Sequence, residues 1–545
     1  MEQRRIFLAI ALSLLIVVLY QELLVKRFYP PGEPPAPAAS TPGAPPLAGE
    51  APAQPPSVEP APAAAAVAVE PVGAGRDVVV DTDLYRAVFT TRGARLKSLE
   101  LKHYPATVAA GSPPLQLVLF PVPTRLPLGL ALRGQEQRID DYSVLYDVDQ
   151  TAADLGSDGS TTLTFTGVLP DGTSLRKRIA MHGHDYLWAV DVEAASVPPT
   201  FSEMALGWDE GIDPAGANAA EVVFDSVLVL QQGKLQHLAF KDLDPPKLLE
   251  KDIGWVGFSG RYFLAALVPQ AEPTNALRVW AHREQDNVAT QVLFPPGTFQ
   301  AHADLYVGPK DIDRLEAVGH GLRKAVDLGW FTFIALPLLQ ALRFLHRFTG
   351  NYGVAIIILT VVLKLLFYPL TKKSFQSMSA MQKLQPEMQK LRERLKDKPD
   401  EMNREVMELY RRHKVNPLGG CLPMVLQIPV FVGLYNALLN AVELRHAPFI
   451  WIHDLSAPDR LGAIQLPFVT HPGIPVLTLA MGGSMLVQQW MTPSAADPAQ
   501  QRAMMIMPLV FTFMFMNFPA GLTLYWLVNN CLTIAQQYAM LRNKR

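Results

Sequence analysis

Residues 352–370 read YGVAIIILTVVLKLLFYPL, an apolar run of nineteen residues with a single charged residue, Lys364. At 1.5 Å per residue, a helix of this length rises about 28 Å, close to the ~30 Å thickness of the hydrocarbon core of a bilayer. The run therefore predicts a membrane-spanning helix. An ammonium near mid-membrane costs about 2.5 to 3.5 kcal/mol on insertion scales, so the lysine calls for an explanation.

Similar apolar runs recur along the chain and set its class. They lie at 6–25, 418–441, 474–491, 504–518 and 522–541. Hydrophobic residues make up 49% of the 545 residues, and the mean hydropathy of +0.14 is high for a soluble protein. We therefore expect a polytopic α-helical membrane protein with six transmembrane helices.

The N-terminal part divides into an anchor and a linker. Residues 1–27 begin with a basic segment and continue as an apolar run without a small-residue cleavage site, which favours an uncleaved signal anchor over a cleaved signal peptide. Residues 28–75 are rich in proline and alanine, with thirteen prolines between positions 30 and 62. This composition predicts an extended linker.

Residues 76–327 have a different pattern. Short segments alternate apolar and polar residues, and turn signals such as Pro170-Asp-Gly172 separate them. About 250 residues of this pattern predict a large antiparallel β-sandwich. We expect residues 312–326 to form a helix that leads back to the membrane.

Residues 328–349 and 350–541 complete the predicted layout. The first segment is apolar but contains two arginines and a histidine, which predicts an amphipathic helix lying on the bilayer surface. The second contains the last five predicted spans. At 372–414 it also has apolar residues with helical spacing on both sides of Lys398-Pro-Asp400, which predicts a helical hairpin.

Positive charges flanking the spans predict the orientation. Residues 371–414 carry twelve Lys and Arg against seven Asp and Glu, and the tail at 542–545 is basic. The loop at 442–473 has only two arginines. We therefore expect both termini and the hairpin in the cytoplasm, and the β domain on the opposite side of the membrane.

The basic faces of the hairpin are candidates for docking a cytoplasmic partner. Such faces suit ribosomal RNA or anionic membrane lipids, although a solvated charged face is an equally good interpretation. The candidate docking residues are Lys383, Lys390, Arg392, Arg394, Arg411 and Arg412.

Lys364 is the first candidate for a functional site. The last five predicted spans contain no Asp or Glu, so no carboxylate within them can pair with the ammonium. One interpretation is that Lys364 extends to the cytoplasmic headgroups, and the other is that it lines a hydrated, positively charged groove. The neutral polar residues of the same spans favour the groove as a set, although each alone can simply join helices. They are Thr360, Gln427, Asn436, Thr512, Asn529, Asn530 and Gln536.

The run at 504–518 has fifteen residues, or about 22 Å of helix, which predicts local thinning of the bilayer. The turn Asn517-Phe-Pro-Ala-Gly521 follows and predicts a hairpin with the last span. Met507 and Phe511 belong to a stripe of soft apolar side chains that suits varied apolar partners, although ordinary packing explains the stripe equally well.

The sequence contains no recognisable catalytic apparatus. Walker A, His-Glu-x-x-His, Gly-x-Gly-x-x-Gly and Gly-x-Ser-x-Gly motifs are absent, and the histidines of the β domain have no ligand spacing. Cys421 and Cys531, the only cysteines, lie in apolar runs, so we interpret them as buried small hydrophobic residues. We therefore expect neither an enzyme, nor a cofactor, nor a metal site.

Several short motifs occur in a fixed order over the second half of the chain. They are Gly350-Asn-Tyr-Gly353, Tyr368-Pro-Leu-Thr371, Val415-Asn-Pro-Leu-Gly-Gly-Cys421, Val442-Glu-Leu-Arg445, Trp451-Ile-His-Asp-Leu-Ser456 and Phe518-Pro-Ala-Gly521. With these motifs and the preceding β domain, nearly the whole chain resembles the YidC-type membrane protein insertases of Gram-negative bacteria, in the YidC/Oxa/Alb family.

The resemblance implies a five-helix insertase core, a periplasmic β-supersandwich, an inner-membrane location and no cofactor. It implies a groove open to the cytoplasm and lipid, in which a positive residue attracts the acidic tail of a substrate. The matching position here is Lys364, where the family's Gram-negative members usually have arginine. Thr360 and Trp526 match other functional positions, the latter replacing a common tyrosine, and Gln427 is a weaker groove candidate.

The partners implied are nascent membrane proteins, membrane lipids, the Sec translocon and the ribosome. Two alternatives remain at this point. One is a small-solute transporter, for which related halves and broken helices would be expected. The other is an envelope-biogenesis protein whose β domain binds carbohydrate.

Overall fold

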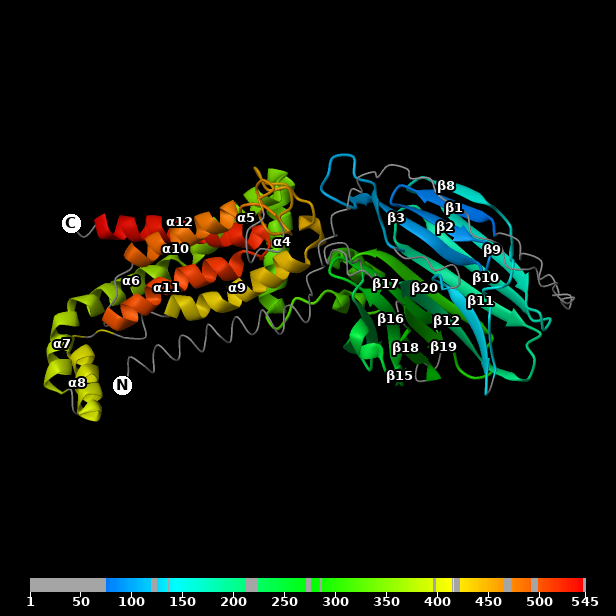
Figure 1. The fold of residues 1–545 in the computed structure, drawn as a ribbon, viewed down its shortest axis with the longest axis horizontal. Coiled ribbons are helices and arrows are strands. Elements are labelled where there is room, and N and C mark those ends of the chain that lie inside the picture. The colour runs from blue at the N-terminus through cyan, green and yellow to red at the C-terminus, as the bar shows by residue number, and fades with distance from the viewer. Residues whose placement is uncertain are drawn as a thin grey trace, which may run out of the picture.

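The computed structural model describes residues 75–118, 125–135, 137–211, 224–270, 276–284, 287–395, 398–413, 415, 422–464, 472–491 and 498–542. The predicted helix at 6–25 and nearly all of the predicted linker lie outside these ranges. The described chain forms a β domain and a helical region that lie end to end (Figure 1).

The β domain contains three sheets. The five-stranded sheet has the order β4-β3-β2-β1-β8 and consists of β1 (Asp77–Thr82), β2 (Tyr85–Thr90), β3 (Arg95–Pro105), β4 (Pro114–Gln116) and β8 (Ala152–Leu155). The nine-stranded sheet has the order β14-β13-β16-β17-β20-β11-β10-β9-β7 and consists of β7 (Asp147–Val148), β9 (Ser160–Val168), β10 (Ser174–His182), β11 (Leu187–Ala195), β13 (Ser226–Gln231), β14 (Lys234–Ala239), β16 (Ile253–Ser259), β17 (Phe263–Gln270) and β20 (Gln300–Pro309). The six-stranded sheet has the order β15-β18-β19-β12-β5-β6 and consists of β5 (Gly129–Gly134), β6 (Arg138–Asp140), β12 (Phe201–Gly211), β15 (Lys247–Glu250), β18 (Arg278–Glu284) and β19 (Asn287–Leu293).

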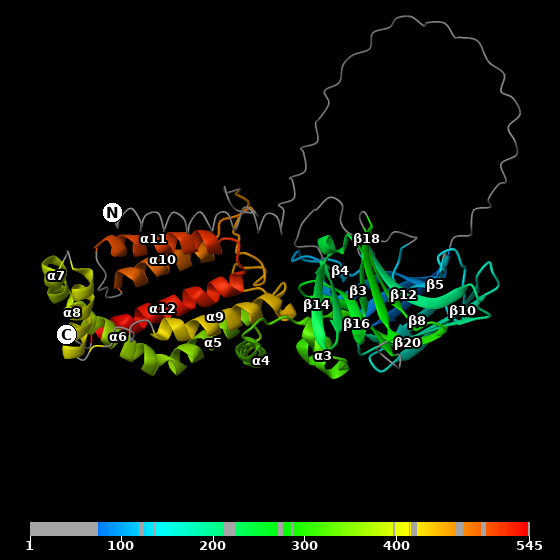
Figure 2. The same cartoon turned by 90° about the horizontal axis from the view of Figure 1, so that it is seen from below.

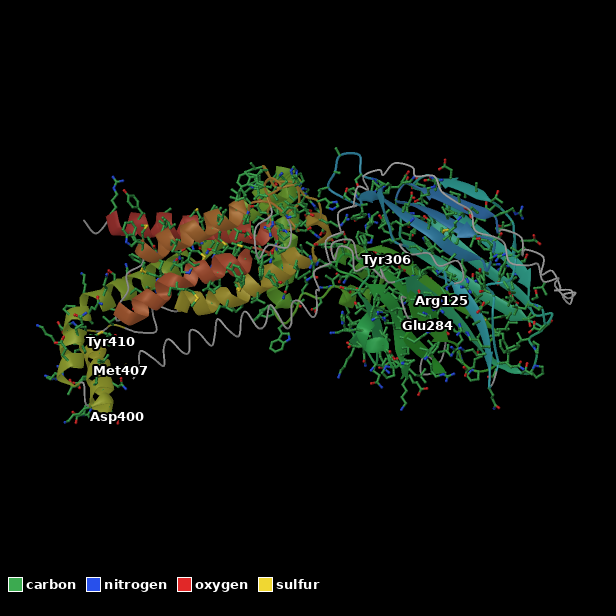
Figure 3. The ribbon with its side chains drawn as sticks, viewed as in Figure 1. Arg125, Glu284, Tyr306, Asp400, Met407 and Tyr410 are labelled. Atoms are coloured by element: carbon green, nitrogen blue, oxygen red, sulfur yellow. The ribbon has the colours of Figure 1, made fainter. Side chains whose placement is uncertain are left out.

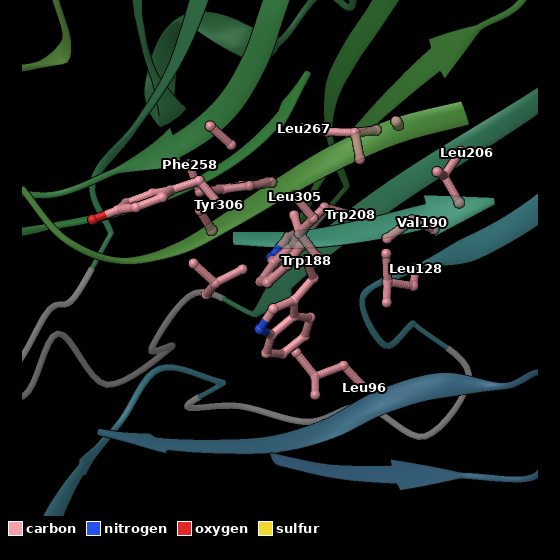
Figure 4. Packing of buried hydrophobic residues seen from close by; sticks show 14 of the residues in the cluster. Leu96, Leu128, Trp188, Val190, Leu206, Trp208, Phe258, Leu267, Leu305 and Tyr306 are labelled. Atoms are coloured by element: carbon pink, nitrogen blue, oxygen red, sulfur yellow. The ribbon is translucent and has the colours of Figure 1, made fainter. Parts of the chain in front are cut away.

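Paired strands are antiparallel except β1 and β8, which are parallel. Burial alternates along a strand such as β10, as expected for a sheet with one face on a core. The core is built around large buried side chains, among them Trp188, whose indole N–H donates to the hydroxyl of Tyr85 at 3.0 Å (Figure 4). The predicted antiparallel β domain is confirmed.

The connection from the β domain to the helical region differs from the prediction. The predicted helix at 312–326 is two short elements, α3 (Ile312–Val318) and the 3-10 helix η4 (Leu322–Ala325). Gly319, His320 and Gly321 separate them, and all three have positive φ angles, of 82°, 50° and 72°. Such angles end a right-handed helix, and glycine adopts them without steric cost.

The helical region is built from nine α-helices in the part of the chain described after residue 331, and a short 3-10 turn. They are α4 (Thr332–Thr349), α5 (Tyr352–Leu366), α6 (Tyr368–Lys383), α7 (Gln385–Arg394), α8 (Pro399–Arg412), α9 (Leu422–Asn440), the 3-10 turn η6 (Val442–Leu444), α10 (Val476–Met491), α11 (Pro498–Phe515) and α12 (Ala520–Arg542). Figure 1 shows the hairpin of α7 and α8 at the end of the molecule remote from the β domain.

The predicted span at 352–370 is broken. Helix α5 ends at Leu366, and α6 continues at an angle of 61°. Pro369 lies in the first turn of α6, where proline is tolerated because it has no N–H to contribute to a preceding turn. The bend therefore directs α6 away from the axis of α5.

Single helices form at the predicted spans 418–441, 474–491 and 522–541. The boundaries of the predicted span at 504–518, like those at 352–370, need correction. Helix α11 begins at Pro498, so the fifteen-residue helix predicted at 504–518 is wrong in length. Within the described ranges, no single helix is long and apolar enough to cross a bilayer by composition alone, whereas the bent pair α5–α6 is, and Leu426–Asn440 and Met505–Phe515 are shorter apolar helices. Cys531 is exposed, which contradicts its interpretation as a buried residue, and Cys421 lies outside the described residues.

Close packing holds the helices together. Helix α4 packs on α5 and α9, while α12 packs on α5 and α10, and Figure 2 shows α10 and α11 on the side of the bundle opposite α4. A Cβ atom at Gly353 would lie 2.2 Å from the ring of Phe449, and one at Gly482 would lie 2.1 Å from the hydroxyl oxygen of Thr512. These positions accept only glycine without movement of their neighbours, and the contact at Gly482 is one between helices α10 and α11, where membrane helices approach closely.

Arginines join the helical region to the β domain. Arg343 of α4 pairs with Glu443 in η6 and, at 2.8 Å, with Asp313 in α3. Arg445 donates to the carbonyl oxygens of Pro105 at 2.7 Å and Ala106 at 3.1 Å, in and after β3. Arg343 is therefore a joint residue, which the sequence pattern of an amphipathic helix did not predict.

Candidate functional site

The ammonium of Lys364 lies between two helices far apart in the sequence. From α5 it donates to the amide oxygen of Asn529 at 3.1 Å and to the hydroxyl of Thr533 at 2.6 Å, both on α12. Asn529 and Thr533 are four residues apart and therefore share one helix face. Both partners are neutral, and the described residues provide no ion pair to Lys364.

A row of polar side chains extends this contact. The amide nitrogen of Gln427, on α9, donates to the same Asn529 oxygen at 3.2 Å. Gln536, one turn beyond Thr533 on α12, donates to the hydroxyl of Thr371 on α6 at 3.1 Å. Four helices, α5, α6, α9 and α12, thus contribute hydrogen-bonding groups to one strip of the bundle interior, which an apolar core would not contain.

A small pocket lies at this strip. Its lining includes Lys364, Thr360, Gln427 and Asn529, together with the apolar groups Leu363, Phe367, Leu370, Val430 and Tyr525. The free volume is about 20 Å³, which is room for about one water. The site is therefore a narrow polar seam in this state, and any larger occupant must separate its walls.

Thr360 and Trp526 occupy different surroundings. Thr360 is buried in the pocket wall, and its hydroxyl donates to the carbonyl of Ile356 at 2.6 Å within its own helix. Trp526 lies one turn before Asn529 on α12, with ring centroids 4.7 Å from Phe431 and 5.1 Å from Phe515. This aromatic cluster places apolar surface next to the polar seam.

Other predicted contacts do not meet at the seam. Asn436 donates to the carbonyl of Leu328 at 3.0 Å, so it ties α9 to the chain entering α4. Thr512 donates to the carbonyl of Pro508 at 2.7 Å. Asn530 faces α10, where it donates to Ser484 at 3.0 Å. Met507 is 51% exposed on α11, and Phe511 is partly buried against Trp526.

Sequence reasoning missed Thr533, which makes the shorter of the two hydrogen bonds to Lys364. The signal was its spacing of four residues from Asn529, which places both on one face of a helix. Threonine is common in membrane helices, so the residue type alone did not distinguish it.

The predicted docking residues lie on the three helices beyond α5. Lys383, Lys390, Arg394, Arg411 and Arg412 are exposed there, whereas the side chain of Arg392 lies outside the described set. Helices α7 and α8 pack through Leu384, Met388, Leu409 and Tyr410, near the tip of the molecule in Figure 3. Arg412 pairs with Glu408 at 2.8 Å, so part of this basic face is neutralised locally.

Comparison with known proteins agrees with this two-part architecture. The family model described as "60Kd inner membrane protein" matches residues 344–545, and that described as "YidC periplasmic domain" matches residues 77–341. The membrane protein insertase YidC of Syntrophus aciditrophicus (strain SB) is 39% identical over 562 residues, covering 98% of each chain. That of Geotalea uraniireducens (strain Rf4) is 43% identical over 471 residues, covering 85% of this chain and 86% of the relative.

A solved structure of an active YidC insertase with its first transmembrane domain resolved is 16% identical, with a TM-score of 0.35 over 86% of this chain and 95% of that chain. The family models and the sequence relatives together define an inner-membrane insertase with a β-rich domain and a helical C-terminal region, and not an enzyme. The chain belongs to the YidC family of membrane protein insertases.

Proposed function

We propose that this insertase moves short acidic tails of nascent membrane proteins across the inner membrane along the seam at Lys364, and releases the following transmembrane helix sideways into lipid. It does so alone or with the Sec translocon. The observation that carries the proposal is the pairing of Lys364 with neutral partners only.

An ammonium surrounded by neutral groups is ready to bind an anion. Helices α5, α9, α10, α11 and α12 contain no Asp or Glu, so their own side chains cannot neutralise Lys364. Asn529 and Thr533 solvate the charge without cancelling it. A substrate carboxylate would add the missing charge in a medium of low dielectric constant, where an ion pair is stronger than in water.

The walls of the seam suit the apolar part of a substrate, because Leu363, Phe367, Leu370 and Val430 line it. Leu365 and Leu366, at the end of α5, are each 67% exposed. Burial of the following helix in lipid supplies free energy, and the membrane potential adds about 2.3 kcal/mol per charge per 100 mV.

The orientation belongs to the same proposal. Both termini and the α7–α8 hairpin lie in the cytoplasm, and the β domain lies in the periplasm. Lys383, Lys390, Arg394 and Arg411 then form a basic surface where a ribosome or an anionic lipid headgroup can dock as the substrate emerges.

The test is insertion of a short phage coat protein with an acidic tail into proteoliposomes containing the pure full-length chain. We expect Lys364→Arg to retain insertion, Lys364→Ala to reduce it, and Lys364→Glu to reduce it about ten-fold or more, because a reversed charge repels the tail. Lys373→Glu is the matched control, since it reverses an exposed charge on α6, nine residues away along the chain.

Equal insertion by all Lys364 variants would contradict the proposal and leave the lysine as an anchor at the headgroups. A loss of insertion in Lys373→Glu as large as in Lys364→Glu would mean that total charge near the cytoplasmic surface matters, and not the seam. A coat protein with a neutral tail should be insensitive to all these substitutions.

A further inference from the structure

The β domain contains a second polar pocket, unrelated to the seam. It lies on the six-stranded sheet and has a volume of about 500 Å³. Alternate residues of neighbouring strands form it, for instance Gly207 and Asp209 of β12 beside Gln291 and Ala289 of β19, which are their register partners. The intervening residues, such as Trp208 and Val288, face the hydrophobic core.

Small residues keep this pocket open. Gly207 pairs with Gly129 of β5 on one side and with Gln291 on the other. Ala131 and Ala289 complete the floor. Since larger side chains at these positions would fill the space, the sheet has a hollow where a solvent-facing sheet would ordinarily carry long polar side chains.

Four of the lining side chains have buried polar atoms without a hydrogen-bond partner. They are Oδ1 of Asp209, Nδ1 of His282, Oδ1 of Asn287 and Oε1 of Gln291. Asn287 and Gln291 are each only 6% exposed. Stacking of His282 on Trp280, with ring centroids 3.9 Å apart, holds the imidazole in place. Leaving such atoms unpaired is costly, so water, an ion or a ligand has to satisfy them.

Cationic groups line the same pocket. Arg95 pairs with Asp141 at 2.9 Å, and Arg138 lines the pocket from β6. Arg125 and Glu284, labelled in Figure 3, pair at 2.8 Å and are 35% and 57% exposed, so they lie at the mouth. Burial raises the pKa of Asp209 to about 6 in spite of the nearby arginines. Perturbed carboxylates of this kind are common at ligand sites.

These groups define the chemistry of the occupant. Three unpaired oxygen acceptors disfavour the oxygens of a phosphate or carboxylate, while three guanidinium groups, two of them paired with Asp141 and Glu284, disfavour a cation. A ligand with hydroxyl groups satisfies both kinds of group, because each hydroxyl donates to an oxygen and accepts from an arginine. The floor is a sheet face whose backbone groups are already paired, so it offers no edge for an added peptide strand.

We propose that this pocket of the β domain binds a neutral saccharide of one or two rings, with Asp209, Asn287 and Gln291 accepting from its hydroxyls and Arg95 and Arg138 donating to them. The volume suits a ligand of that size. This proposal does not depend on the seam at Lys364.

The experiment is saturation-transfer NMR on the full-length chain in phospholipid nanodiscs, because alkyl glycoside detergents would bring sugar headgroups. The probes are glucose, galactose, N-acetylglucosamine and lactose, with inorganic phosphate and a neutral tripeptide as competitors. We expect at least one saccharide to bind, and Asp209→Asn and Gln291→Leu each to weaken it about ten-fold or more. Asp158→Asn, an exposed change in the turn before β9, should leave the affinity unchanged.

Two variants are used so that misfolding of one cannot hide the answer, and the thermal midpoint of the β domain reports folding for each. Absence of binding by all four saccharides overturns the proposal. So does an affinity unchanged in both pocket variants, or displacement of the saccharide by phosphate or the tripeptide at equal concentration. Coat protein insertion by Asp209→Asn should equal that of the unmodified chain, which separates this pocket from the proposed insertion function.

Discussion

The guanidinium of Arg343 is shared between Glu443, in the turn that follows α9, and Asp313, in the helix that ends the β domain. One side chain of α4 therefore contacts both halves of the molecule. Burial raises the pKa of Glu443, while the charge of Arg343 opposes that rise. The contact between the β domain and the helical region therefore depends on a largely buried ion pair, in which the side chain of Arg343 is 15% exposed and that of Glu443 is 19% exposed.

Weakening the ion pair of Arg343 with Glu443 should destabilise the contact between the β domain and the helical region. In Glu443→Gln the arginine retains Asp313, so we expect a loss of about 1 to 3 kcal/mol, below the 3 to 5 kcal/mol of a fully broken buried pair. Limited proteolysis between α3 and α4 should become several-fold faster. Glu316→Gln is the control, because it removes a more exposed pair with Arg323. An unchanged cleavage rate would show that the apolar contacts of α4 hold the joint alone.

A buried ionic cluster should dominate the stability of the β domain. Lys177, 1% exposed, pairs with Asp141 at 2.5 Å, and Arg95 pairs with the same carboxylate. Burial lowers the pKa of Lys177 to about 8 even with this partner. Asp141→Ala should destabilise the domain by about 3 to 5 kcal/mol, because it leaves a buried cation without a counter-charge.

The thermal midpoint of the β domain, followed by tryptophan fluorescence, checks this prediction. Asp140→Ala removes a neighbouring carboxylate that is 47% exposed and 4.0 Å from Arg95, so its effect should be small. The double variant Lys177→Met/Asp141→Leu should recover only part of the loss, since it removes the charges of Lys177 and Asp141 but leaves the buried Arg95 without this partner. Equal effects of Asp140→Ala and Asp141→Ala would refute the assignment.

Asp209 should make the stability of the β domain depend on pH. Burial raises its folded-state pKa from 3.8 to about 6, against the opposing charges of Arg95, Arg125 and Arg138. The folded state then binds more protons than the unfolded state between pH 4 and 6, so stability falls as pH rises through this window. Asp209→Asn should therefore stabilise the domain more at pH 7.5 than at pH 4.5, by up to about 2 kcal/mol.

Thermal midpoints of the two proteins at both pH values provide the measurement, with Asp158→Asn as the exposed control. A stabilisation that does not change with pH would show that Asp209 keeps an ordinary pKa. Stabilisation together with loss of saccharide binding would be the pattern expected of a residue kept for a ligand.

Thr533 should compete with a substrate for Lys364. Its hydroxyl accepts the 2.6 Å hydrogen bond from the ammonium, and a hydrogen bond to a charged group contributes about 1.5 to 3 kcal/mol. Thr533→Val keeps the shape but removes this acceptor, so cross-linking of an acidic tail at Lys364 should increase about ten-fold or more. Thr512→Val, which removes a hydroxyl bonded within α11, should have no effect. Weaker cross-linking in Thr533→Val would mean that the hydroxyl positions the ammonium for substrate.

Hydropathy and alternation predicted the two-part architecture because both are local in sequence. The break after α5 was not predicted, since a proline at position 369 is compatible with either a continuing span or a bend. The start of α11 was missed because residues 498–503 include Gln500, Gln501 and Arg502, and the helix begins before the apolar run. Lys364 stood out in the sequence because a charge in an apolar run is rare.

Contacts between residues far apart in the sequence were harder to predict. The partner Thr533 lies 169 positions from Lys364, and no local pattern links the two. The pocket on the six-stranded sheet was not predicted either, because Gly129, Asp209, His282 and Gln291 meet only through the strand order of that sheet. Each of these residues is ordinary in its own strand.

The hydrogen bonds of Lys364 on α5 to Asn529 and Thr533 on α12 have a further consequence for the proposed mechanism. Lys364 cannot turn fully toward an arriving carboxylate while it also holds Asn529 and Thr533. Binding of the acidic tail to Lys364 and separation of α5 from α12 then become a single event, because the tail replaces the hydrogen bonds that join the two helices. Without a substrate, the protein would stay closed to ions and solutes and would need no separate gate. Only a ligand that replaces the hydrogen bonds of Lys364 to Asn529 and Thr533 would open the seam.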